Sequence, residues 1–315
     1  MNFFEQQAVA RRTSARLVFL MAVAIAGIVL AVDAVVWVAT QSPELVLFAT
    51  LSSVAVIALG SLYRIASLGG GGEPVAQQLG GTLVPESTTE PGLRRLRNVV
   101  EEIAIASGVP VPKVYVLEHE AGINAFAAGY STSDAVIAVT RGALDRLNRD
   151  ELQGVVAHEM GHVANNDVLY MTAVGVLVGL IVVVSDLALR STRVMGRSSQ
   201  SDRKGGGGVA ILAIVVLIAV GLLSPIAATL VQMAVSRQRE YLADATAVKL
   251  TRNPLGLIGA LRKLDQAPVR WDDASKAVQH LFIVNPFKKF GENASALMST
   301  HPSVEQRVQR LQDLG

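Results

Sequence analysis

The chain has 315 residues, of which 51% are hydrophobic and 17% are charged, and its formal net charge is +2. It is too apolar for an ordinary soluble protein and too charged for a purely membrane-embedded one, so we expect water-facing and bilayer-crossing parts. The small net charge, and basic residues that do not cluster with aromatics, argue against a nucleic-acid partner. Because there are no cysteines, disulfides and thiolate metal sites are excluded, and any metal must be held by His, Asp or Glu.

Two long apolar stretches come first, at residues 17–38 and 45–63. At about 1.5 Å per residue, each is long enough to cross a ~30 Å hydrocarbon layer as a helix. The first is too long for the apolar core of a typical signal peptide and no cleavage site follows it, so we expect a retained anchor. Arg11, Arg12 and Arg16 precede it, and the positive-inside rule then places the amino terminus in the cytoplasm.

A flexible glycine run at 69–72 leads into ordinary globular sequence. Apolar spacing predicts a helix over 93–106. Asn148 and Glu151 form a capping-box pattern, which predicts that a second helix begins there and continues to residue 165. Runs rich in β-branched and apolar residues predict short strands at 114–117, 125–129 and 135–140.

A second pair of apolar stretches covers residues 168–189 and 209–235. Buried core helices are the alternative for all four stretches, but such helices rarely stay apolar on every face for about twenty residues. We therefore expect about four transmembrane helices. The loop 190–208 is basic, which conflicts with the positive-inside rule if this hairpin crosses twice, so an interfacial hairpin stays open as the alternative. Further helices are expected at 237–249, 254–264 and 302–314.

The segment His158-Glu-Met-Gly-His162 has the H-E-x-x-H pattern. Residues four apart on a helix differ by about 40° in azimuth, so the two imidazoles face the same way and can share one tetrahedral metal ion. Glu159 is offset by about 100° and can act on a metal-bound water without being a ligand. A helix that merely carries surface histidines is the alternative. We favour a zinc site with Glu159 as the catalytic base.

A hydrolytic zinc site needs a third protein ligand and an open position for water. Glu240 and Asp244 lie four apart after the last apolar stretch, so they share a helix face. We expect Glu240 to complete the coordination and Asp244 to accept the free ring N–H of a ligand histidine. The alternative is a charged turn in which Arg237 and Arg239 contact lipid headgroups and pair with these acids.

The combination of His158–His162 with Glu240-Tyr-Leu-Ala-Asp244 after a hydrophobic hairpin resembles the HtpX-like membrane metalloproteases, gluzincins related to the CAAX prenyl proteases. Segments 98–104 and 122–129 and the string Ser299-Thr-His-Pro-Ser303 match as well, from about residue 73 onward. Ser303, where many members have a second proline, and the long basic loop 190–208 depart from the family.

The resemblance implies functions for further residues. Asn124, Ala125 and Phe126 would begin an edge strand that binds extended substrate through its backbone, whereas an ordinary hairpin strand is the alternative. His301 would stabilise the developing oxyanion, and Arg307 would orient it or a ligand.

The expected fold is mainly α with a small β-sheet: a gluzincin-type metalloprotease domain plus about four transmembrane helices. The hairpins would cover residues 1–68 and 168–235. The catalytic domain would be divided between 73–167, with the H-E-x-x-H helix, and 236–315, with the third ligand.

We expect a membrane-anchored endopeptidase with one catalytic zinc ion, active on unfolded or membrane-associated polypeptides in membrane protein quality control. It would be a multi-pass protein of the plasma membrane, with its active site on the cytoplasmic side and no nucleic-acid partner. An intramembrane-cleaving zinc protease and a non-catalytic zinc-binding membrane scaffold are the rival hypotheses.

Overall fold

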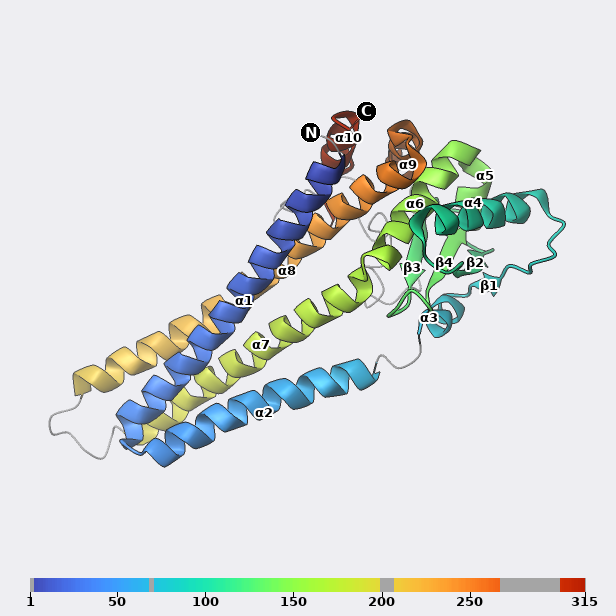
Figure 1. Ribbon diagram of the computed structural model, residues 1–315. Coiled ribbons are helices and arrows are strands. Elements are labelled where there is room, and N and C mark those ends of the chain that lie inside the picture. Colours follow the sequence, from blue (N-terminus) through green and yellow to red (C-terminus); the bar gives the residue numbers. More distant parts are fainter. Residues whose placement is uncertain (1–2, 68–70, 199–206, 267–300, 315) are drawn as a thin grey trace. The chain divides into compact units, whose positions relative to one another are not determined.

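The computed structural model describes residues 3–67, 71–198, 207–266 and 301–314 (Figure 1). These residues divide into two compact units, which are described separately. The first unit contains residues 1–14, 70–171 and 235–315, and the second contains residues 15–69 and 172–234.

The second unit is built from long helices that contain the four apolar stretches. They are α1 (Phe3–Thr40), α2 (Pro43–Ser67), α7 (Asp167–Ser198) and α8 (Gly207–Thr251). By length and composition, one segment among the described residues, Gln7–Ala34 of α1, is long and apolar enough to cross a membrane. Shorter apolar helical segments cover Pro43–Ala55 and Asp167–Gly179. The number of spans expected from the sequence is larger than this.

Large apolar side chains in the second unit point outward. Phe19, Leu30 and Phe48 are 67%, 67% and 69% exposed, respectively. A contiguous exposed apolar surface of this kind suits a lipid environment better than water. Within this unit the Thr50 hydroxyl donates a 2.8 Å hydrogen bond to Oδ2 of Asp33, which joins α1 to α2.

α8 corrects one sequence-based expectation. The separate helix expected at 237–249 is the end of α8, which continues unbroken to Thr251 although it contains Pro225. A proline removes one backbone hydrogen bond and kinks or breaks a helix only where the neighbouring turn cannot adapt. Here Thr229 donates a side-chain hydrogen bond to the Pro225 carbonyl at 2.8 Å. Residues 226–236 contain no glycine or proline, so the helix has no reason to stop before Arg237.

The first unit contains a four-stranded mixed sheet in the order β1-β2-β4-β3. Its strands are β1 (Thr82–Leu83), β2 (Lys113–Leu117), β3 (Ala125–Ala128) and β4 (Val136–Thr140). β2 and β4 are parallel, whereas β3 is antiparallel to β4 and lies at the edge. Three of the strands were expected from the sequence. The two-residue β1 is too short to leave a periodic signal.

Helices surround this sheet and form the core. They are α3 (Gly72–Gln78), α4 (Pro91–Ser107), α5 (Arg141–Arg146), α6 (Arg149–Ala164), α9 (Pro254–Gln266) and α10 (Val304–Gln312). α6 is central, because it packs against α4, α9 and the edge strand β3. It begins with the expected capping box: Asn148 accepts from the Glu151 N–H, and Glu151 accepts from the Asn148 N–H.

Two glycines let other helices approach α6 closely. A Cβ built on Gly154 would lie 2.6 Å from the backbone nitrogen of Leu257 in α9. A Cβ on Gly161, inside the H-E-x-x-H motif, would lie 3.2 Å from the Cα of Ala243 in α8. At Gly154 only glycine leaves room for the neighbouring backbone, and at Gly161 a side chain would be tight, so the two positions let the carboxyl-terminal elements lie against the motif helix.

Candidate active site

α6 places the H-E-x-x-H motif inside the first unit. Leu152, Val156 and Met160 on this helix are fully buried in the main hydrophobic core. His158 is 0% exposed, and the side chain of His162 is 17% exposed, so the motif extends from the interior toward solvent. A buried helix with two imidazoles on one face gives a fixed, partly accessible position for a ligand.

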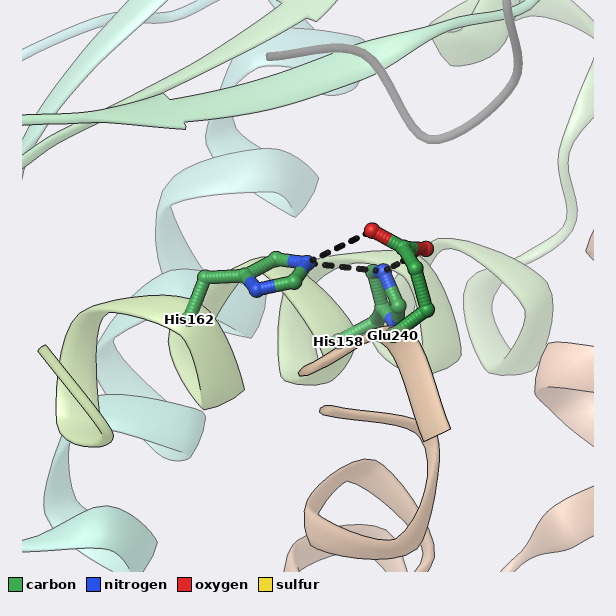
Figure 2. A group of neighbouring side chains, drawn as sticks. All are labelled: His158, His162 and Glu240. Atoms are coloured by element: carbon green, nitrogen blue, oxygen red, sulfur yellow. Dashed lines mark hydrogen bonds and ion pairs between the residues drawn. The ribbon is translucent and has the colours of Figure 1, made fainter. Parts of the chain in front are cut away.

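Glu240 of α8 lies beside both imidazoles, as Figure 2 shows. The Nε2 atoms of His158 and His162 are 3.2 Å apart. Oε2 of Glu240 lies 3.6 Å from Nε2 of His158, and Oε1 of Glu240 lies 3.6 Å from Nε2 of His162. In a tetrahedral zinc site with bonds of about 2.0–2.1 Å, neighbouring donor atoms are separated by about 3.3 Å. The three side chains therefore fit a zinc ion.

Each histidine has a carboxylate at its other ring nitrogen. Nδ1 of His158 lies 2.9 Å from Oδ1 of Asp244, and Nδ1 of His162 lies 2.7 Å from Oδ2 of Asp167. A carboxylate at Nδ1 favours the tautomer with the proton on Nδ1, which leaves the Nε2 lone pair for a metal. Both imidazoles are thus oriented as metal ligands usually are.

Asp167 was not among the residues selected from the sequence. In an unbroken helix, residues five apart differ by about 140° in azimuth, so Asp167 would not be expected to reach His162. The helix is broken between them, because Asn166 has a φ of 52°. Asparagine tolerates this left-handed conformation better than most residues. The sequence signal for this break was the Asn165-Asn166 pair that follows the motif.

The environment of Arg239 also differs from the one that the sequence-based alternative gave it. The sequence-based alternative placed it at lipid headgroups, whereas it is 7% exposed and forms an ion pair with Asp167. Arg237 is half-buried. The acid next to the motif is therefore paired with a buried cation, and that cation does not contact lipid headgroups.

The carboxyl-terminal helix α10 brings two more residues to the site. Arg307 is 1% exposed and donates to Asp244 from Nε at 2.9 Å and from Nη2 at 2.6 Å. Its Nη1 lies 3.3 Å from Oε2 of Glu240. His301, just before this helix, has Nδ1 at 3.3 Å from Oε1 of Glu240. Both residues expected from the family resemblance therefore lie beside the carboxylates of the site.

Burial sets the protonation states of the motif residues. Burial and the charge of Arg307 lower the pKa of His158 to about 4, so its imidazole is neutral near pH 7. The pKa of Glu159 is raised to about 7, chiefly by burial and also by the nearby Glu240 carboxylate, against the opposing effects of His162, the Ala127 backbone and Arg307. A carboxyl group with a pKa near neutrality is suited to accept and return a proton.

The other two carboxyl groups are held in the charged form. Burial acts to raise the pKa of Glu240, but His301 and Arg307 outweigh it and keep that pKa well below its ordinary value. Burial also opposes ionisation of Asp244, and Arg307 and His158 lower its pKa overall. Glu240 is thus available as an anionic donor.

The edge strand β3 lies next to Glu159. The backbone of Ala127 forms a hydrogen bond that favours the Glu159 carboxylate. Asn124 precedes the strand and is fixed by its own contacts, since its N–H donates to Thr140 and its side chain accepts from the Ala125 N–H. Phe126 is 0% exposed and packs in a small cluster apart from the main core. Contact with a substrate along this strand would therefore use its backbone.

A shallow hollow that is open to solvent lies where β3 ends, beside the helix break. His162 contributes a polar side chain to its wall, and most of the other lining side chains are small or apolar. The lining residues are Ala127, Ala128, Gly129, Tyr130, Ser131, Ala135, His162, Val163, Asn166, Val168 and Leu169. Of the other two histidines, His119 is exposed in the loop after β2 and does not join this site, and His280 lies outside the described residues.

Comparisons with known proteins agree with this geometry. The sequence model of peptidase family M48 matches residues 93–314. The "Protease HtpX homolog" of Thermoanaerobacter pseudethanolicus is 43% identical over 220 residues, which cover 70% of this chain and 71% of the relative. The "Protease HtpX homolog" of Pyrococcus furiosus is 44% identical over 222 residues, or 70% of this chain and 73% of the relative.

The solved structure of Ste24p from S. mikatae has the same fold. It superposes with a TM-score of 0.53 at 19% identity, and the match covers 96% of this chain and 67% of Ste24p. The family match spans both sequence segments that meet in the candidate metal site, and members of this family are zinc-dependent in general. The chain therefore belongs to peptidase family M48, as an HtpX-like, membrane-associated metalloprotease.

Proposed function

We propose that the protein is a zinc-dependent endopeptidase whose ligands are His158, His162 and Glu240 and whose catalytic base is Glu159. One observation carries the proposal: the two Nε2 atoms lie 3.2 Å apart, and each has its own Glu240 carboxylate oxygen at 3.6 Å, so the three side chains can converge on one ion. Two uncharged imidazole lone pairs facing one another repel unless a cation or proton lies between them. The anionic Glu240 beside them makes a divalent cation the matching ligand.

A zinc ion bound there would polarise a peptide carbonyl and lower the pKa of a water molecule. Glu159 accepts the proton of the attacking water and returns it to the leaving amine. A general base must be strong enough to take the proton and weak enough to release it. In the metal-free protein burial raises the pKa of Glu159 to about 7. Asp244 and Asp167 hold the ligand imidazoles, and Arg307 holds Asp244.

His301 is proposed to donate a hydrogen bond to the oxyanion that develops on the substrate carbonyl. The contact of its Nδ1 with Glu240, at 3.3 Å, supports this function.

The substrate is proposed to bind as an extended strand beside β3, along Asn124, Ala125 and Phe126. Backbone pairing with the edge of a sheet tolerates many side chains, which suits unfolded or membrane-associated polypeptides and a function in membrane protein quality control. The hollow at the end of β3 is proposed to hold one small apolar side chain of the substrate, because alanine, valine and leucine dominate its walls.

The membrane arrangement is proposed to have four crossings, by residues 1–68 and 168–235, in the plasma membrane. The catalytic domain, formed by residues 73–167 and 236–315, would face the cytoplasm, and its partners would be the bilayer and polypeptides, not nucleic acid. The Gln7–Ala34 span and the arginines before residue 17 support this orientation. If the hairpin 168–235 lies in the interface instead, both of its ends still emerge on one side.

Activity and metal content of Glu159→Gln separate this proposal from its rivals. The variant keeps the ligands and the size of the side chain but lacks the base, so zinc content should stay at the wild-type level. Cleavage of an unfolded protein in detergent should fall by about a hundredfold or more, and a chelator should abolish wild-type cleavage. Equal cleavage by both forms would exclude Glu159 as the base. Wild-type protein that binds zinc but cleaves nothing would favour the scaffold.

A further inference from the structure

We propose that Asp167 is a positioning residue for His162, and that Arg11 near the amino terminus of α1 helps to hold it in place. The inference rests on the proposed zinc site and adds residues that act through a ligand without touching substrate. All the residues involved belong to the first unit. A change in the amino-terminal segment would then alter how tightly the metal is held.

The contact between Asp167 and His162 depends on the turn that follows the motif. Asn165 caps α6, and its side chain donates to the Gly161 carbonyl at 2.7 Å. Asn166 then adopts a φ of 52°, and α7 begins at Asp167. This turn brings the carboxylate to 2.7 Å from Nδ1 of His162. Asp167 is 4% exposed, so water does not replace it easily.

Arg239 fixes Asp167 from the opposite side. Its guanidinium forms an ion pair with Asp167 and donates to the Asn165 carbonyl at 2.8 Å. It also lies over the Tyr170 ring, 4.7 Å from the ring centroid. A buried guanidinium with a carboxylate, a carbonyl and an aromatic face as partners has little freedom to move. Asp167 is therefore held between a zinc-ligand imidazole and a rigid cation.

The amino-terminal segment of α1 completes this network. Arg11 donates from Nη2 to the Asn165 side-chain oxygen at 2.9 Å, and Gln7 donates to the Thr246 hydroxyl at 2.8 Å. Asn165 also donates to the Thr246 hydroxyl at 3.3 Å, so its side-chain amide links α1, the end of α6 and α8. Arg11 is close enough to Arg239 to contribute, after burial, to lowering its pKa. The first turns of the anchor helix thus stabilise the turn that presents Asp167.

The proposed contact predicts different effects for the loss of Arg11 and the loss of the neighbouring Arg12. Arg11 and Arg12 carry the same charge, precede the same apolar span and are both exposed. They should affect membrane orientation alike. The described contacts to the turn come from Arg11, so loss of Arg11 should affect the metal and loss of Arg12 should not.

The test is the rate at which a chromophoric chelator removes zinc from the full-length, detergent-solubilised protein. Asp167→Asn should weaken zinc binding by about 10–100-fold, as changes to residues that orient a metal ligand do. Arg11→Ala should speed zinc loss by about 2–10-fold, the effect of one hydrogen bond, and Arg11→Lys should restore part of the difference. Arg12→Ala should match the wild type. Cobalt-substituted Asp167→Asn should show an altered ligand-field spectrum because the imidazole has turned.

Two outcomes overturn the inference. If Asp167→Asn has the zinc affinity and the cobalt spectrum of the wild type, Asp167 does not position His162. If Arg11→Ala and Arg12→Ala lose zinc to the chelator at equal rates, the amino-terminal segment does not help to hold Asp167 in place. Failure of the proposed zinc site looks different, because the wild type would then take up no zinc or His162→Ala would release zinc no faster than the wild type.

Discussion

Arg307 donates two hydrogen bonds to Asp244, from Nε at 2.9 Å and from Nη2 at 2.6 Å, with both side chains buried. This bidentate pair joins α10 to α8 next to the imidazole of His158. The guanidinium has the planar, forked shape that a carboxylate matches, and a lysine ammonium cannot reproduce it. The carboxyl-terminal helix therefore contributes to the site through one cation.

The first prediction concerns Arg307→Ala. Removing this cation leaves the buried carboxylates of Asp244 and Glu240 without compensation, so the free energy of unfolding should fall by about 3–5 kcal/mol. Arg310→Ala is the matched control on α10, since Arg310 is exposed and lies over the Tyr241 ring at 3.7 Å. Its loss should cost about 1 kcal/mol or less. Denaturant unfolding measures both, and equal effects would contradict a special function for Arg307.

The second prediction ranks the proposed ligands. Glu240→Ala and His162→Ala each remove one of three protein bonds to the metal, so both should purify with little zinc. Asp244→Asn keeps all three donors and should weaken zinc binding by about 10–100-fold. Metal analysis after equilibrium dialysis provides the measurement. Full zinc occupancy in Glu240→Ala would mean that another residue is the third protein ligand.

The third prediction uses the pKa of Glu159. Its pKa rises from an ordinary 4.5 to about 7 in the folded protein, so the protonated acid is favoured in the folded state. In metal-free protein this contribution to stability is fully present below about pH 4.5 and is lost as the pH rises through 7. Metal-free Glu159→Gln should therefore be more stable than the wild type at pH 8, by on the order of 3 kcal/mol. The two should have similar stabilities near pH 4.5.

Thermal melts of both proteins with chelator, from pH 4.5 to 8, test the sign. A stability difference that is constant with pH would mean that Glu159 titrates at its ordinary value. A wild type that is more stable at pH 8 would reverse the assigned shift. Excess zinc should reduce the difference, because a nearby cation favours the carboxylate.

The fourth prediction compares glycines in helices. A Cβ at position 154 would meet backbone atoms of α9, so Gly154→Ala should destabilise the protein by about 1–3 kcal/mol. Gly161→Ala needs neighbours to move by only a few tenths of an ångström and should cost less. Gly92→Ala in α4 meets a side-chain oxygen at an ordinary 3.6 Å and should stabilise by up to about 1 kcal/mol. Any other order of the three melting temperatures contradicts the packing around α6.

The fifth prediction concerns the membrane orientation. The chain has no cysteine, so single thiols can be introduced without a background signal. A thiol at Gln41 should react with an impermeant reagent added to intact cells, and one at Ser131 should be protected. Labelling of Ser131 from outside would place the active site on the other face. A thiol at Ser199 tests the second hairpin, because reaction from outside requires two crossings.

Much of the first unit could be predicted because its signals are local. The capping box of Asn148 and Glu151, the helical spacing of α4 and the strand runs of β2, β3 and β4 each depend on neighbours in the sequence. The third corner of the donor set, Glu240, was found because the i, i+4 relation with Asp244 gives both one helix face. These features need no knowledge of how distant segments meet.

The contacts that could not be predicted depend on tertiary structure. Asp167 reaches His162 only because the backbone at Asn166 is left-handed, which hydrophobic periodicity does not record. The ion pair of Arg239 with Asp167 joins segments more than seventy residues apart. Arg11 was assigned to the membrane surface by its charge, whereas its guanidinium also contacts Asn165.

The most direct measurement is anomalous X-ray scattering at the zinc absorption edge from crystals of the purified protein. One peak is predicted about 2.0–2.2 Å from Nε2 of His158, Nε2 of His162 and a carboxylate oxygen of Glu240. Nδ1 of each imidazole should keep its carboxylate partner. A zinc peak elsewhere, or zinc bound without Glu240, would contradict the proposed site.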